Sequence, residues 1–427
     1  MDPNLRYLGI GAGVRAFGYS LVGPFLALYL RNIWGISYIE LGVVFFLLGI
    51  IPIPFSIGGG LLTDRIGRRR LFLLTLAGEA ISMGLLAWAM IMSSLWLVIV
   101  ATVILSIVAS IGGPALSAYV ADFAIGSERT KGYTWWRVGM NAGFAAGVAS
   151  GGFLIPVLGF GMSVAVSSVV LVGGVILVLV LLKPSPYDLK LAEGAPAAVA
   201  TGAKIVHPGL WFHKEPSAHK GPSLMESLKV MARDRTFMAI CFAMALGVVT
   251  VGQWNVTFSL FVNNKMGISY ELLGLGLSLN GIIVVVGQTA TTNSVLGHRL
   301  TTIAIGGTVL YVVAYLAMGA ATLFAFFPVI VFFVAVGVLT MGENLNAITG
   351  STLPSNMAPP RELGSYNGAF GAIVTVGSLV AILAGGLALQ AIANPLIFWV
   401  VLVLPALPAS WLLYRTSRAI PTTVDRA

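Results

Sequence analysis

Four ionisable side chains lie inside long apolar stretches of this sequence, and they are the residues best placed to do chemistry. Arg15, Glu79, Arg137 and Glu343 each stand among aliphatic, aromatic and glycine residues. A charge at the centre of a membrane helix costs about 2.5–3.5 kcal/mol on insertion scales, so each is a candidate functional group. The sequence has no glycine-rich phosphate loop, and its four histidines form no metal-ligand pattern. We expect no enzyme activity, no cofactor and no metal.

The four charged groups predict two kinds of binding. An arginine that faces a cavity can bind an anionic group or neutralise a buried carboxylate, which are the functional roles open to Arg15 and Arg137. The structural alternative is a side chain that reaches the membrane surface from near a helix end. A carboxyl at Glu343 can load and release a proton near neutral pH, or be held in an ion pair. Glu79 is the second acid, and a hydrogen-bonded structural role is the stronger interpretation for it.

Uncharged polar side chains in the same stretches complete the candidate set for substrate and proton binding. Residues three or four apart share a face of a helix, which places Asn141 beside Arg137 and Asn346 beside Glu343. The full set of uncharged candidates is Asn141, Gln253, Asn255, Asn280, Gln288, Asn344 and Asn346.

The elements that carry these residues are membrane-length helices. Of the 427 residues, 58% are hydrophobic and 9% charged, against about 25% charged in soluble domains. A spanning helix needs about 20 mainly apolar residues, and a β-barrel would show short alternating segments instead. We predict an all-α polytopic membrane protein with twelve spans: 7–30, 38–62, 71–92, 95–120, 132–156, 161–182, 236–262, 271–296, 301–323, 327–351, 364–390 and 394–414.

Basic residues are distributed unevenly between the connecting segments. Twenty lie in segments on one side of the predicted membrane, and two, Arg31 and Lys265, lie on the other. Because lysine and arginine are retained in cytoplasmic loops, we predict both termini and the long polar segment 183–235 in the cytoplasm. The net charge of +9 then sets orientation and requires no nucleic-acid partner. Within the polar segment, Ser223 to Arg235 has the spacing of an amphipathic surface helix.

An internal repeat divides the sequence into two halves. The tetrapeptide Gly35–Tyr38 recurs as Gly267–Tyr270, an offset of 232 residues. Such a parallel repeat predicts two pseudo-symmetric six-helix bundles, with substrate bound near the membrane midplane between them. The predicted domains are an N-terminal bundle, a cytoplasmic linker that contains the amphipathic helix, and a C-terminal bundle, at 1–182, 183–235 and 236–427 respectively.

A charged tight turn follows the second apolar stretch and reads GGGLLTDRIGRRR from Gly58 to Arg70. Gly67 can adopt a positive φ, which lets two helices reverse direction, and Asp64 can pair with Arg65 or Arg68. The spacing resembles the loop between transmembrane helices 2 and 3 of the major facilitator superfamily, which reads roughly G-x-L-x-D-R-x-G-R-R/K. A generic basic loop would supply arginines without this spacing. The matching residues are Gly60, Leu62, Asp64, Arg65, Gly67, Arg68 and Arg69.

This resemblance implies a transporter that works by alternating access. It also implies that Asp64, the arginines after it and Asp122 form a cytoplasmic latch that breaks when the protein opens inward. The residues expected in the latch are Gly60, Asp64, Arg65, Gly67, Arg68, Arg69 and Asp122. We expect a small-molecule substrate, protons and the lipid bilayer as partners, and a monomer in the inner membrane of a cell.

The resemblance is greatest to the drug:proton antiporter branch, which implies proton-coupled export of a small organic molecule. The fifth predicted helix resembles the antiporter motif G-x3-G-P-x2-G-G, but Val148 stands at the proline position. The first helix also has no acid. Two alternatives therefore stay open. One is a proton-coupled uptake symporter of a sugar, peptide or organic acid, and the other is a receptor or scaffold that does not transport.

Overall fold

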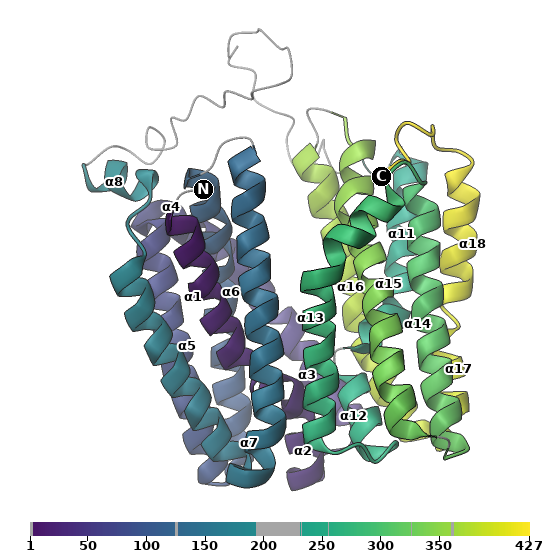
Figure 1. Cartoon of the computed structure of the whole chain (residues 1–427), viewed down its shortest axis with the longest axis horizontal. Coiled ribbons are helices and arrows are strands. Elements are labelled where there is room, and N and C mark those ends of the chain that lie inside the picture. Colours follow the sequence, from purple (N-terminus) through teal and green to yellow (C-terminus); the bar gives the residue numbers. More distant parts are fainter. Residues whose placement is uncertain are drawn as a thin grey trace, which may run out of the picture. The chain divides into compact units, whose positions relative to one another are not determined.

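The structure, a computed structural model, describes residues 3–123, 127–193, 231, 233–254, 256–325, 327–359 and 363–427. These residues form helices and contain no strand, which confirms the predicted all-α class (Figure 1). Asn255 and most of the predicted amphipathic helix Ser223–Arg235 lie outside the described residues. The elements are α1 (Pro3–Ser20), η1 (Gly23–Phe25), α2 (Leu26–Trp34), α3 (Tyr38–Ile50), α4 (Pro52–Ile66), α5 (Arg68–Ile91), α6 (Leu95–Phe123), α7 (Ser127–Leu181), α8 (Pro186–Ala192), α11 (Arg235–Val251), η2 (Gly252–Trp254), α12 (Thr257–Asn264), α13 (Tyr270–Val295), α14 (Leu300–Leu323), α15 (Pro328–Met357), α16 (Leu363–Ala391), α17 (Pro395–Val403) and α18 (Ala406–Ser417).

Eleven helical stretches of the described chain are long and apolar enough to cross a membrane. One of them, within α7, joins two predicted spans. Gly159 has φ 77° and ψ 167°, outside the helical region, so α7 is two helices that meet at this residue. A straight helix of its 55 residues would be about 80 Å long, far beyond the hydrocarbon core of about 30 Å. The eleven stretches therefore account for the twelve predicted spans.

The first two predicted spans each contain a local irregularity next to a proline, and each remains one membrane-length helical stretch. The first is divided at the 3-10 turn η1, which contains Pro24, and the second is divided at Ile51, just before Pro52. Proline has no backbone N–H to donate and its ring clashes with the preceding turn, which explains why the helices break at these positions.

The contacts divide the chain into two compact units. Unit 1 consists of Met1–Tyr29, Leu47–Phe212 and Tyr270–Ile282. Unit 2 consists of Leu30–Phe46, His213–Ser269 and Ile283–Ala427. Each unit thus includes the N-terminal part of one helix, α13 or α3, from the other half of the sequence.

Two close glycine contacts hold these transferred helix segments. In unit 2, α3 crosses α16 so closely that a Cβ added to Gly386 would lie 3.0 Å from the Cα of Gly42. In unit 1, α13 crosses α7, and a Cβ added to Gly152 would lie 3.1 Å from the Cα of Gly274. Gly42 and Gly274 are separated by the same 232 residues as the repeated tetrapeptide. The sequence repeat therefore recurs as the same type of backbone contact in each unit.

Candidate functional site

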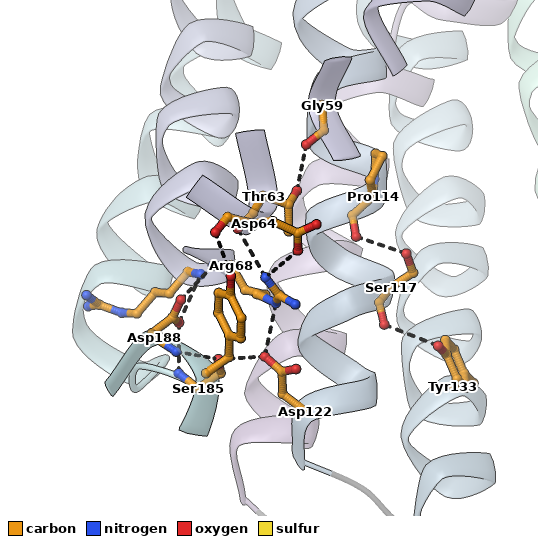
Figure 2. Close-up of polar contacts among 12 residues, drawn as sticks. Gly59, Thr63, Asp64, Arg68, Pro114, Ser117, Asp122, Tyr133, Ser185 and Asp188 are labelled. Atoms are coloured by element: carbon orange, nitrogen blue, oxygen red, sulfur yellow. Dashed lines mark hydrogen bonds and ion pairs between the residues drawn. The ribbon is translucent and has the colours of Figure 1, made fainter. Parts of the chain in front are cut away.

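Arg68 forms the centre of a charged cluster at the turn between α4 and α5 (Figure 2). Gly67 makes this turn with φ 95°. The Arg68 Nη1 donates to Asp64 Oδ1 at 2.9 Å and to the Thr63 carbonyl oxygen at 3.1 Å. Its Nε lies 3.2 Å from Oδ2 of Asp122 on α6. One buried guanidinium therefore pairs with two carboxylates that come from different helices.

The segment that contains α8 closes over this cluster. The ring of Tyr187 lies against Arg68, with 3.5 Å between its centroid and the guanidinium carbon. The Tyr187 hydroxyl donates to the Asp64 carbonyl oxygen at 2.5 Å, and Ser185 Oγ donates to Asp122 Oδ2 at 2.7 Å. A cation facing an aromatic ring in a desolvated place is attracted by about 2 kcal/mol. The α8 segment thus binds both the arginine and its two acids.

The α8 residues were not predicted as part of the cluster, because residues 183–235 were assigned to a linker. A usable signal was present in the sequence. Ser185 and Asp188 have the spacing of a helix capping box, S-x-x-D, directly after an apolar stretch. The structure contains this box: Asp188 N donates to Ser185 Oγ, and Ser185 N donates to the Asp188 carboxylate.

Three other residues of the charged turn, Arg69, Arg65 and Gly60, have surroundings that differ from those of Arg68. The Arg69 side chain donates to the carbonyl oxygens of Leu182 and Leu179 at the end of α7, at 2.5 and 2.9 Å, and the Arg69 backbone N–H donates to the Asp188 carboxylate at 3.2 Å. Arg65 is exposed. A Cβ added to Gly60 would meet nothing within 4 Å, whereas one added to Gly59 would lie 2.5 Å from the Ile111 carbonyl oxygen. The close helix approach is therefore made by Gly59, and Gly60 of the motif takes no part in it.

Arg15 and Glu79 were predicted as separate candidates, and the structure pairs them. Arg15 Nε donates to both carboxylate oxygens of Glu79, at 2.9 and 2.8 Å, and Arg15 Nη2 donates to Oε1 at 2.6 Å. Nη2 also donates to the Ala109 carbonyl oxygen at 3.1 Å. The Glu79 side chain is fully buried and that of Arg15 is 17% exposed. Of the two functional roles considered for Arg15, this geometry is the neutralisation of a buried carboxylate.

Arg137 and Asn141 lie one turn apart on α7, as the helical spacing predicted. Asn141 Nδ2 donates to the Arg137 carbonyl oxygen at 2.9 Å. Arg137 is exposed in this structure, and its predicted position facing a cavity stays a prediction.

The amide candidates of the second half fall into two groups. Gln253 is fully buried, and its Nε2 donates to the carbonyl oxygens of Val249 and Ala381, at 2.8 and 3.0 Å. It thus ties η2 to α16, which is a structural role. Asn280 is buried and Gln288 half-buried on α13.

Glu343 lies near the middle of α15 and faces α14. It interacts electrostatically with Tyr311 and Tyr315, which are both buried. The two helices approach closely here, because a Cβ added to Gly342 would lie 2.7 Å from the Gly307 carbonyl oxygen. Glu343 therefore lies near two phenol groups, where α14 and α15 pack closely.

Asn344 and Asn346 each carry a buried amide nitrogen, Nδ2, with no hydrogen-bond partner among the described residues. Asn346 also lines a small cavity of about 120 Å³ inside unit 2, together with Thr308 and Gly350. Both amides thus keep a free donor close to Glu343 in the sequence.

The membrane-length helices, with charged side chains buried among them, define a polytopic membrane protein, and the comparisons with known proteins identify its family. The Major Facilitator Superfamily model matches residues 8–339. The tetracycline resistance protein, class B, of Escherichia coli is 31% identical over 140 residues, which are 32% of this chain and about a third, 34%, of that protein. The uncharacterized MFS-type transporter YttB of Bacillus subtilis (strain 168) is 24% identical over 389 residues, 90% of this chain and 88% of that one. A crystal structure of the nucleoside transporter NupG shares the fold, with a TM-score of 0.72 at 12% identity, covering 97% of this chain and 100% of that chain.

The chain belongs to the Major Facilitator Superfamily. It is a multi-pass membrane transporter, and its substrate is a small molecule.

Proposed function

We propose that this transporter exports a small organic molecule across the inner membrane in exchange for protons, with both termini in the cytoplasm. The similarity to the tetracycline resistance protein supports the drug-type substrate. The excess of basic residues in one set of connecting segments supports the orientation.

The assignment of the proton to Glu343 follows from a comparison of two intramembrane acids. Glu79 is balanced by the bidentate guanidinium of Arg15, so its carboxylate has a fixed positive partner. Glu343 lies within the membrane-length helix α15, near Tyr311 and Tyr315 of α14. Acidic residues within membrane-spanning helices are characteristic of proton pathways. The position of Glu343 within α15 is the observation that carries the coupling proposal.

The cluster around Arg68 supplies the conformational element of the proposal. Asp64, Arg68 and Asp122 join α4, α5 and α6, and α8 covers them. Opening toward the cytoplasm requires these ion pairs to separate, and the protein would alternate between the paired and the separated arrangement.

Purified protein in liposomes, with a pH-sensitive dye trapped inside, tests the coupling. Tetracycline is added outside as the probe, without an imposed gradient, and protein-free liposomes correct for passive entry. Exchange predicts internal alkalinisation as tetracycline enters, and Glu343→Gln should abolish it. Glu193→Gln, at an exposed acid that follows α8, is the matched control and should behave as wild type.

Three outcomes count against the proposal. Internal acidification would mean that solute and proton move together, which is uptake symport. Tetracycline flux without a pH change would remove the proton role of Glu343. Absence of any tetracycline flux would refute the proposed kind of substrate.

A further inference from the structure

Asp188 binds the first turn of α5 through its side chain. Its Oδ1 accepts the backbone N–H of Arg68 at 2.6 Å, and its Oδ2 accepts those of Arg69 at 3.2 Å and Ser185 at 2.8 Å. Asp188 belongs to the segment that follows α7, so this carboxylate links the beginning of the third predicted span of the first half to the end of the sixth. A carboxylate at a helix N-terminus also interacts favourably with the helix dipole.

Asp425 does the same to the first turn of α14 in unit 2. Its Oδ1 accepts the Thr301 N–H at 2.9 Å, and its Oδ2 accepts the Thr301 hydroxyl at 2.6 Å. The Asp425 carbonyl oxygen accepts the Leu300 N–H at 3.3 Å, and the residue is fully buried. The segment that carries it follows α18, the last span of the second half. Arg299 adds a positive charge 3.9 Å from Oδ2.

The two contacts occupy equivalent places in the repeat. The offset of 232 residues, found from the tetrapeptides, relates Arg68 to Leu300 and Arg69 to Thr301. In both halves, therefore, the same turn of the third span is bound by an aspartate from the segment after the sixth span. The second half of the sequence lacks the full charged turn of the first half, and the Asp425 contact lies at the corresponding turn in unit 2.

We propose that Asp188 and Asp425 are positioning residues of the transport cycle, which make the third and sixth spans of each half move as one body. The helices that they hold carry the groups described above. α5 carries Glu79, the partner of Arg15, and α14 carries Tyr311 and Tyr315 beside Glu343. The inference rests on the transport function of this superfamily. It does not depend on the direction of transport or on the coupling ion.

The chemistry of the two carboxylates predicts unequal effects of the same substitution. In Asp188→Asn, the new amide nitrogen would face only N–H donors, because three backbone amides converge on this carboxylate. In Asp425→Asn, Thr301 can keep its N–H bond to Oδ1 and turn its hydroxyl to accept from the new amide. The Asp188 variant should therefore be the more severe of the two.

Hydrogen–deuterium exchange on the purified full-length protein tests the linkage without a known substrate. Asp188→Asn should speed exchange about tenfold or more, as expected for losing bonds to a charged acceptor, in the first turn of α5 and in residues 182–188. The first turn of α14 should stay protected, and Asp425→Asn should show the converse with a smaller change. Asp234→Asn is the matched control, because Asp234 caps α11 by accepting the Phe237 N–H at 2.9 Å, and its other partner, the Tyr366 hydroxyl at 3.2 Å, can turn to accept from the new amide.

A transport measurement separates positioning from simple capping. Tetracycline uptake into liposomes should show a lower maximal rate for Asp188→Asn with KM unchanged, whereas Asp234→Asn should retain its rate per folded molecule. Exchange that rises only in the first turn of α5, or does not rise, would overturn the proposal, as would an unchanged maximal rate. If the wild-type protein moves no tetracycline, the proposed substrate class fails and the exchange comparison decides this inference alone.

Discussion

The ion pair between Arg15 and Glu79 predicts a strongly coupled effect on stability. At an effective dielectric of about 20, opposite charges separated by the observed 2.8 Å attract by about 6 kcal/mol, and desolvation of both groups offsets much of this. Removing one partner leaves the other buried without its counter-charge, which costs about 3–5 kcal/mol. Glu79→Leu and Arg15→Met should each destabilise the protein by this order, because Glu79 is fully buried and Arg15 is 17% exposed.

The double variant carries the decisive information. Replacing both members of a buried pair by apolar residues of similar volume is often neutral, so Arg15→Met combined with Glu79→Leu should recover most of the lost stability. The single cysteine of the chain, Cys241, is buried, so a thiol-reactive dye reports unfolding in a thermal scan. Glu193→Gln, at an exposed acid, is the control and should not shift the midpoint. Additive losses in the double variant, or single variants that match wild type, would refute the reasoning.

Two further predictions concern packing and the charged cluster. Gly152→Ala should slow transport and lower the unfolding midpoint, because the added methyl would lie 2.7 Å from the Tyr270 carbonyl oxygen. Gly371→Ala is the control and should do neither, since its methyl would meet nothing within 4 Å. Equal behaviour of the two variants in a transport assay would contradict the close crossing of α7 and α13. Tyr187→Phe should lower the stability by only about 1 kcal/mol in the same thermal scan, since it loses one hydrogen bond but keeps the ring against Arg68. A loss of stability larger than that of Tyr187→Ala would show that the ring contributes nothing.

Features that depend on a residue's neighbours in the sequence could be predicted. Long apolar runs gave the spans, because a membrane helix needs a continuous apolar stretch and little else. The pairing of Asp64 with Arg68 was among the predicted pairs, because the two opposite charges flank the same tight turn in the sequence. The break at Gly159 was also implied, since a turn was required between two spans.

Features that depend on tertiary packing could not be predicted. Arg15 and Glu79 were both recognised as intramembrane charges, but nothing in either local sequence identifies a partner 64 positions away. Gly59 and Gly60 are chemically identical in the sequence, and only the position of α6 decides which one lies against Ile111. A shift of one residue along a helix moves a side chain from the packed face to the exposed face, and a sequence motif does not specify the packed face this finely.

The contacts of Asp188 and Asp425 show a third kind of limit. Both carboxylates accept hydrogen bonds from backbone N–H groups, which every residue except proline carries. No pattern of side chains therefore marks the turn to which each carboxylate binds. The receiving turns agree with the 232-residue offset, but the aspartates do not: the offset relates Asp188 to Ile420, five positions before Asp425. A backbone-directed contact needs only an acid that can reach the turn, so each half can supply it from a different position. Equivalent contacts in a repeated fold are therefore better searched for at the backbone N–H groups that are bound than at the residue that supplies the carboxylate.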